Sequence, residues 1–141
     1  MIKILFLCTG NSCRSQMAEG WTNSLKGDVI EAYSAGIETH GLNPNAVQVM
    51  EESGVDISTH TSQLASEFKD TIFDYVVTVC GHAHENCPVY LGKSTVIHVG
   101  FDDPPKLAAE VDGKEEKLDC YRAVRDQIRD FVLTLPGSLE R

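Results

Sequence analysis

Long hydrophobic runs are missing from this chain of 141 residues. No apolar stretch approaches the ~20 residues that a membrane-spanning helix requires. The N-terminus also lacks the basic region and the cleavage site of a secretory signal, because its apolar stretch, which begins at Ile4, ends at Cys8. We therefore expect a cytoplasmic protein that does not associate with a membrane.

Positive charge is scarce as well. The sequence has 12 Lys and Arg residues against 21 Asp and Glu residues, which gives a formal net charge of −9. This balance argues against nucleic acids and anionic membranes as partners. It also repels an anionic substrate at long range, so affinity for an anion has to come from a local group of donors.

Cysteine occurs in an odd number, five, without the regular spacing of a disulfide framework. With 42% hydrophobic residues, the chain can bury enough apolar surface to fold as one domain over residues 1–141 without disulfide bonds. Reduced thiols with a catalytic or redox role fit this composition better than structural disulfides. We expect a monomer without a bound metal or cofactor.

Strand-like and helix-like segments alternate along the chain. Short apolar runs predict strands at 3–7, 29–35, 73–79 and 95–99. Helices are predicted at 15–26, 44–53 and 115–135, and a shorter one is expected to begin near Ser62. Asn43, Pro44 and Gly54 are typical of the two ends of the second long helix.

The inner faces of the first and last helices follow from the spacing of their apolar residues. These residues are Met17, Ala18, Trp21 and Leu25 in the first helix, and Leu118, Tyr121, Val124, Ile128, Phe131 and Leu135 in the last. The alternation predicts an α/β fold of three layers, with a four-stranded parallel sheet covered on both faces. Ligands bind beyond the carboxyl ends of such strands, so Cys8, Cys80 and Asp103 should lie at one rim.

The segment from Cys8 to Ser15 (Cys-Thr-Gly-Asn-Ser-Cys-Arg-Ser) follows a predicted buried strand and opens a predicted helix. Backbone N–H groups of such a turn can point inward, and the positive end of the helix adds to them. Arg14 can bind two oxygens of a tetrahedral anion with its planar fork. The same field favours the thiolate form of Cys8, which we expect to lie beneath the anion and to attack it.

The predicted anion-binding residues are Thr9, Gly10, Asn11, Ser12, Cys13 and Arg14. Cysteine is often buried for packing alone, but Cys8 together with Asn11 and Arg14 favours an anion site. Ser15 has two interpretations that are compatible with each other. Its hydroxyl donates to the Cys8 thiolate and lowers the thiol pKa, or it caps the first turn of the helix.

Two further cysteines, Cys80 and Cys87, have six residues between them. A phosphatase needs one nucleophilic cysteine, whereas a thiol reductase supplies two electrons and needs at least two thiols. We interpret Cys8, Cys80 and Cys87 as one relay. Two alternatives stay open: a core cysteine beside an incidental surface thiol, or a zinc site formed with His82 and His84.

These segments resemble a known family. The run from residue 8 to 20 (Cys-Thr-Gly-Asn-Ser-Cys-Arg-Ser-Gln-Met-Ala-Glu-Gly) is similar to the opening of low-molecular-weight tyrosine phosphatases, and more similar to the thioredoxin-coupled arsenate reductases built on the same fold. The resemblance continues at 34–37 (Ser-Ala-Gly-Ile), 41–47 (Gly-Leu-Asn-Pro-Asn-Ala-Val), 77–81 (Val-Thr-Val-Cys-Gly), 87–88 (Cys-Pro) and 100–104 (Gly-Phe-Asp-Asp-Pro). It therefore covers nearly the whole chain.

The resemblance implies a reaction for the three thiols. Cys8 would attack arsenate, Cys80 would then attack the Cys8 sulfur as arsenite leaves, and Cys87 would attack Cys80. A thioredoxin would reduce the resulting disulfide. Asp103 would protonate the leaving oxygen, and Pro104 restricts the backbone of Asp103 to an extended state.

Two alternatives to that role of Asp103 stay open: Asp102 is the acid, or Asp103 is only a turn residue. The resemblance also raises the question of a potassium ion, which some family members bind beside the active-site loop with asparagine, glutamate, serine and aspartate. Asn11, Glu19 and Ser34 match three of these ligands, but Gln63 replaces the aspartate. We therefore expect no potassium site.

Other functions compete with reduction. One is a tyrosine phosphatase, but residues 36–41 contain no aromatic side chain and Pro105 follows Asp-Pro, so a phosphotyrosine ring lacks a platform. A weak phosphatase side activity is compatible with the shared anion site. Another is a module that stores zinc or arsenite without turnover.

Several cysteines and histidines are expected to have no catalytic role. Cys13 should pack inside the loop, and Cys120 should pack against the core from the last helix. His40, His60 and His98 are interpreted as surface or structural histidines.

Overall fold

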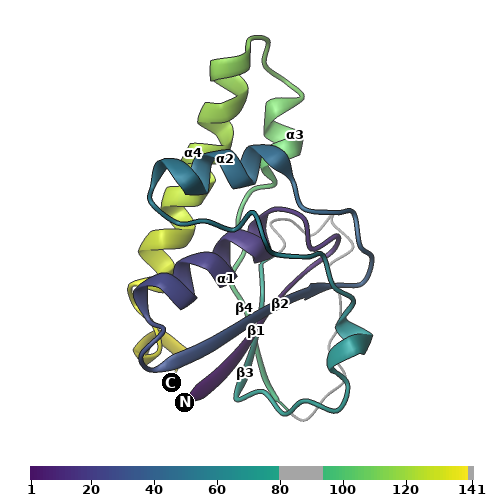
Figure 1. Ribbon diagram of the computed structural model, residues 1–141, viewed down its shortest axis with the longest axis vertical. Coiled ribbons are helices and arrows are strands. Elements are labelled where there is room, and N and C mark those ends of the chain that lie inside the picture. Colours follow the sequence, from purple (N-terminus) through teal and green to yellow (C-terminus); the bar gives the residue numbers. More distant parts are fainter. Residues whose placement is uncertain (80–93, 140–141) are drawn as a thin grey trace.

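Four parallel strands form the centre of the fold (Figure 1). The computed structural model describes residues 1–79 and 94–139, so Cys80 and Cys87 lie outside the described residues. The strands are β1 (Ile2–Cys8), β2 (Ile30–Gly36), β3 (Tyr75–Thr78) and β4 (Thr95–His98). All four predicted strands are confirmed, with ends shifted by at most two residues.

The strands pair in the order β2-β1-β3-β4. β1 is central, with Cys8 beside Gly36 of β2 and Leu7 beside Thr78 of β3. β1 is an almost entirely apolar run, as expected for a strand of a parallel sheet that is covered on both faces. The carboxyl end of β1 therefore brings Cys8 to the edge of the sheet.

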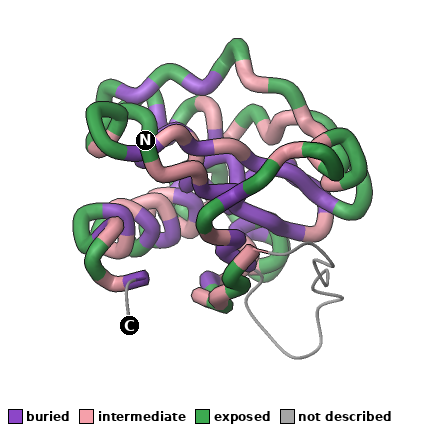
Figure 2. The backbone as a smooth tube through the Cα atoms, turned by 90° about the horizontal axis from the view of Figure 1, so that it is seen from below, coloured by how far each residue is buried: buried purple, intermediate pink, exposed green. Residues whose placement is uncertain are grey.

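Helices cover one face of this sheet (Figure 1). They are α1 (Arg14–Leu25), α2 (Pro44–Glu52) and α4 (Lys114–Val132), and a short α3 (Pro104–Ala108) packs on α4. The side chain of Asn43 caps α2 by accepting from the backbone N–H groups of Asn45 (2.8 Å) and Ala46 (3.3 Å), and Gly54 adopts a positive φ just after its end. Figure 2 shows that buried residues concentrate along the strands and on the inner turns of the helices.

The opposite face of the sheet carries a smaller apolar cluster formed by Leu5, Leu7, Ala35, Phe73 and Val76. The rings of Tyr33, Phe68 and Phe73 pack edge to face against one another, with centroids 5.6–5.9 Å apart. The connection that contains the 3-10 turn η1 (Ala65–Phe68) supplies part of this layer. The three-layer α/β arrangement with a four-stranded parallel sheet is therefore confirmed.

Some local predictions were wrong. The short helix expected to begin near Ser62 begins at Ala65 and is a 3-10 helix. Leu25 is 39% exposed, because the last turn of α1 is not covered as its earlier turns are. The last helix ends at Val132, a few residues before Leu135, and a 3-10 turn η2 (Gly137–Leu139) follows it. α3 was not predicted, because only the paired prolines that start it are visible in the sequence.

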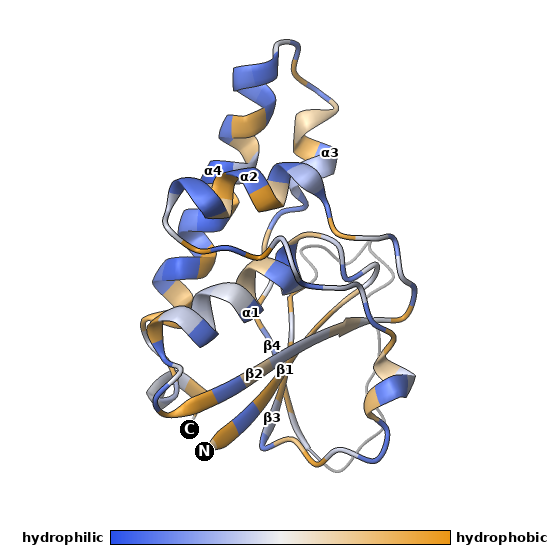
Figure 3. Ribbon diagram, in the orientation of Figure 1, coloured by the Kyte–Doolittle hydropathy of each residue, from blue (hydrophilic) through white to orange (hydrophobic). Residues whose placement is uncertain are grey.

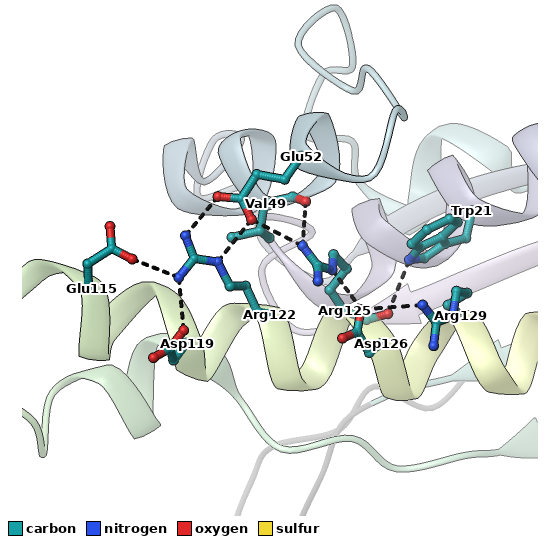
Figure 4. A network of polar contacts seen from close by, with 9 residues as sticks. All are labelled: Trp21, Val49, Glu52, Glu115, Asp119, Arg122, Arg125, Asp126 and Arg129. Atoms are coloured by element: carbon teal, nitrogen blue, oxygen red, sulfur yellow. Dashed lines mark hydrogen bonds and ion pairs between the residues drawn. The ribbon is translucent and has the colours of Figure 1, made fainter.

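An ion-pair network joins α2 to α4 (Figure 4). Glu52 of α2 accepts hydrogen bonds from Arg122 at 2.9 and 2.8 Å and from Arg125 at 3.3 Å. Trp21 of α1 donates its indole N–H to the carbonyl of Arg125 at 3.1 Å, so α1 joins the same side of α4. Hydrophilic and hydrophobic residues alternate along α4 (Figure 3), as expected of an amphipathic helix. Within the described ranges, no helix combines the length and the apolar character that a membrane crossing needs.

Candidate active site

Cys8 is the last residue of β1, and its side chain is buried at 4% exposure. A loop from Thr9 to Cys13 leads directly into α1, which begins at Arg14. The predicted succession of strand, loop and helix is thus present, and it brings the thiol of Cys8 near the positive end of α1.

The segment that links β2 to α2 holds this loop from outside. Its backbone N–H groups donate to three carbonyls of the loop: Glu38 to Thr9 (3.0 Å), His40 to Gly10 (3.0 Å) and Asn43 to Ser12 (2.9 Å). The hydroxyl of Ser62 donates a second hydrogen bond to the Gly10 carbonyl at 3.1 Å. These donors occupy the carbonyl oxygens on the outside of the loop, which favours an interior without exposed acceptors, as an anion requires.

Asn11 fixes the loop from behind. It has a positive φ of 48°, a conformation that asparagine tolerates better than most residues. Its fully buried side chain accepts a hydrogen bond from the backbone N–H of Gln63 at 2.7 Å and donates one to the Ser15 hydroxyl at 2.8 Å. Because the Ser15 oxygen accepts from Asn11, the Ser15 hydroxyl hydrogen can be donated to another acceptor.

The side chain of Arg14 is buried, at 5% exposure, and polar partners hold it in place. Its guanidinium donates to the Phe101 carbonyl at 3.0 Å, and another of its nitrogens lies 3.9 Å from a carboxylate oxygen of Asp103. Asp103 has the extended backbone expected before proline, with φ −85° and ψ 108°. The structure thus brings together Arg14 and Asp103, which are far apart in the sequence.

A pocket of about 330 Å³ opens above Cys8. It is lined by Cys8, Thr9, Gly10, Ser12, Cys13, Arg14, His40, Asp103 and Pro105. Most of the predicted anion-binding residues therefore share one cavity with Cys8 and Asp103. Asn11 and Ser15 are buried behind this lining, and the relative placement of Cys80 and Cys87 is not described.

Cys13 is a buried thiol of the pocket wall. Burial, with a smaller contribution from the negative charge of Asp103, raises the pKa of Cys13 well above that of an ordinary thiol. Cys13 therefore stays protonated at neutral pH, in agreement with its predicted role as a packing residue. Cys120 packs against the core from α4 and is half-buried, as its predicted packing role requires.

A polar network below the loop was missed by the sequence interpretation. Gln16 is fully buried and donates to the Asn11 carbonyl at 3.2 Å and to the Thr61 carbonyl at 3.0 Å. Its side-chain oxygen lies 3.0 Å from Nδ1 of His60, so His60 has a structural role here. Hydrogen bonds between segments this distant in sequence leave no local pattern that would reveal them.

The residues matched to a potassium site make contacts with one another and with neighbouring protein groups. The side-chain oxygen of Asn11 already accepts from the N–H of Gln63. Glu19 accepts from the Ser34 hydroxyl at 2.6 Å and lies 3.5 Å from His60, and burial raises the pKa of its carboxyl. Protein donors thus contact these oxygens, and Gln63 supplies no carboxylate; the absence of a potassium site stays a prediction.

Comparison with known proteins agrees with this geometry. The family model described as low molecular weight phosphotyrosine protein phosphatase matches residues 3–141. The chain belongs to this family. The predicted resemblance to its fold is thereby confirmed.

Within the family, the chain is similar to several arsenate reductases. One from Halalkalibacterium halodurans is 54% identical over 131 residues, which cover 93% of this chain and 92% of the relative. One from Bacillus subtilis is 50% identical over 125 residues, or 89% and 88% of the two chains. A solved arsenate reductase in its phosphate-binding state superposes with a TM-score of 0.79 at 32% identity and covers 98% of both chains.

Proposed function

We propose that this protein reduces arsenate to arsenite through a relay of three cysteines. The observation that carries the proposal is the pocket in which Cys8, Arg14 and Asp103 meet, within a chain about half identical to arsenate reductases. Arsenate has the size and charge of phosphate and suits the same tetrahedral site.

In the first step, the Cys8 thiolate attacks arsenic. A sulfur–arsenic bond forms, an arsenic–oxygen bond breaks, and the oxygen leaves as water after it takes a proton from Asp103. Arg14 and the loop bind the remaining oxygens, and Ser15 donates to Cys8 before the attack. A guanidinium nitrogen of Arg14 lies 3.9 Å from a carboxylate oxygen of Asp103. This distance supports a site in which the anion bound by Arg14 lies beside the acid Asp103.

In the second step, two electrons pass to arsenic. The Cys80 thiolate attacks the Cys8 sulfur, the sulfur–arsenic bond breaks, and its electron pair leaves with arsenic as arsenite. Cys87 then attacks Cys80 and releases Cys8 as a thiolate, leaving a Cys80–Cys87 disulfide. Val79, directly before Cys80, donates its N–H to the carbonyl of Leu7, directly before Cys8, at 3.0 Å. This hydrogen bond supports an attack of Cys80 on Cys8, because it joins the residues that precede the two cysteines.

A thioredoxin, bound through a transient mixed disulfide, reduces the Cys80–Cys87 pair and closes the cycle. We further propose that residues 1–141 form one domain that acts as a monomer in the cytoplasm. These statements rest on the family resemblance and on the composition of the chain.

A coupled assay tests the proposal. Protein, arsenate, thioredoxin, thioredoxin reductase and NADPH are mixed, and NADPH oxidation is followed. We expect oxidation that depends on arsenate, and a Cys87→Ser variant that fails after a single turnover. Full activity of Cys80→Ser and Cys87→Ser toward an aryl phosphate, with no NADPH use, would instead identify a phosphatase.

Weak hydrolysis of phosphate monoesters is proposed as a side activity. The same pocket and nucleophile serve both reactions, and the family model that matches the chain is a phosphatase model. The measurement is release of nitrophenol from para-nitrophenyl phosphate.

A further inference from the structure

His40 lies against the loop from Thr9 to Cys13, called the anion loop below, although its sequence context predicted only a surface or structural histidine. A Cβ atom placed on Gly10 would lie 2.3 Å from Nδ1 and 2.8 Å from Cγ of His40. The imidazole therefore covers the Cα of Gly10 at a distance that leaves no room for a side chain there. His40 is also one of the residues that line the pocket above Cys8.

Glu38 holds this ring in place. Its carboxylate oxygen lies 2.6 Å from Nε2 of His40, at the end of the ring away from the backbone. The backbone N–H groups of both residues bind the loop, at Thr9 and Gly10. The backbone of His40 is thus bound to the loop, and its ring contacts Glu38 through Nε2, with the side chains of both residues more than half exposed.

The described pocket lining outside the loop consists of His40, Asp103 and Pro105. A free tetraoxo anion has four small oxygens, and a phosphate monoester carries a carbon group on one of them. When the other three oxygens bind the loop and Arg14, the carbon group has to project out of the pocket. It passes through the opening between His40, Asp103 and Pro105, which is called the mouth below.

We propose that His40, held by Glu38, is a specificity-determining residue of this pocket: its imidazole above Gly10 narrows the mouth, so a free tetraoxo anion enters while an organic monoester is hindered. This inference deepens the proposed function, because it explains how a pocket of the phosphatase type is kept for an inorganic anion. The mechanism is steric: the bulk of the ring narrows the mouth, and the contact of Nε2 with Glu38 keeps the ring there.

The test compares His40→Ala with His40→Leu, which keeps most of the side-chain volume without ring nitrogens. For each variant, para-nitrophenyl phosphate hydrolysis is measured, with inorganic phosphate as a competitive inhibitor to report free-anion binding. In His40→Ala we expect kcat/KM for the ester to rise about tenfold. The inhibition constant of phosphate should stay within about threefold of the starting protein. His40→Leu should raise kcat/KM for the ester less than His40→Ala does, because leucine keeps most of the side-chain volume but loses the contact with Glu38.

His98→Ala is the matched control, since it removes another exposed histidine with a side-chain partner, Thr78, away from this pocket. If His40→Ala does not fold, Glu38→Ala is tested in its place. This substitution removes the contact with the ring of His40 but keeps the backbone hydrogen bonds to the loop, so we expect a smaller rise in kcat/KM for the ester. Unchanged or reduced ester hydrolysis in folded His40→Ala, or in its replacement Glu38→Ala, overturns the proposal. An ester rise in His40→Leu as large as that in His40→Ala also overturns it, and so does an equal loss of phosphate binding in these two variants. Neither measurement uses Cys80, Cys87 or thioredoxin, so failure of the relay is read separately.

Discussion

Asn11 offers the sharpest test of how the anion loop is held. Its side chain makes buried hydrogen bonds to Gln63 and Ser15, and its backbone has a positive φ of 48°. Replacement by glycine removes the side chain but keeps the backbone conformation accessible. Replacement by alanine removes the same bonds and also imposes a side chain on a left-handed conformation.

The two substitutions should therefore differ by a predictable amount. Both leave the N–H of Gln63 and the hydroxyl of Ser15 without their partner, and each buried group left unsatisfied costs about 1–3 kcal/mol. We expect Asn11→Gly to lose about 2–6 kcal/mol of unfolding free energy. Asn11→Ala should lose about 1 kcal/mol more, since the left-handed conformation costs alanine about 1–2 kcal/mol and glycine gives back part of this through the unfolded chain.

Urea denaturation of the two variants and the starting protein measures these differences, and calorimetric titration with inorganic phosphate reports the state of the loop. Both variants should bind phosphate more weakly, because Asn11 positions the loop. Equal stability of the Gly and Ala variants would refute the left-handed backbone conformation assigned to Asn11. Losses below about 0.5 kcal/mol in both would refute the assigned hydrogen bonds.

Other predictions concern the packing, the ion pairs and the thiols. A Cβ on Gly36 would lie 2.7 Å from the carbonyl oxygen of Thr9, so Gly36→Ala should lose about 1–3 kcal/mol in denaturation and weaken phosphate binding. The hydrogen bond from Arg122 holds the pKa of Glu52 below its usual range, so this pair stabilises the fold above the unfolded carboxyl pKa and loses its effect as pH falls through the lower folded value. The gap in Tm between the starting protein and Glu52→Gln at neutral pH should therefore start to narrow as pH falls below the ordinary carboxyl pKa of about 4.3 and close below the lower folded value. A gap that does not narrow in acid contradicts the pair. Because burial raises the pKa of Cys13, iodoacetamide should leave this thiol unmodified in the folded protein at neutral pH and label it only after unfolding, as peptide mapping would show.

The parts of the fold that were predicted correctly depend on local patterns. β1 is a continuous apolar run, and α2 carries its cap at Asn43 and its stop at Gly54, so short stretches of sequence contain the information. The extended backbone of Asp103 follows from the proline after it in the same way. The loop from Cys8 to Arg14 was found because its chemistry lies within one continuous segment.

The parts that were missed depend on contacts between distant segments. His40 reaches the pocket because β2 ends beside β1, which brings the residues after Gly36 onto the loop after Cys8. Gln16 and the Thr61 carbonyl are likewise joined only by the folded chain. A short sequence window around either residue carries no sign of such a neighbour.

A single turnover without thioredoxin examines the three-thiol relay itself. Fully reduced protein is mixed with excess arsenate, arsenite is quantified, and the disulfides are mapped by mass spectrometry. We predict about one arsenite per chain, because each reduction consumes one pair of thiols, with a Cys80–Cys87 disulfide in the starting protein and a Cys8–Cys80 disulfide in Cys87→Ser. Arsenite formed without either disulfide, or no arsenite from a folded and reduced chain, would contradict the relay.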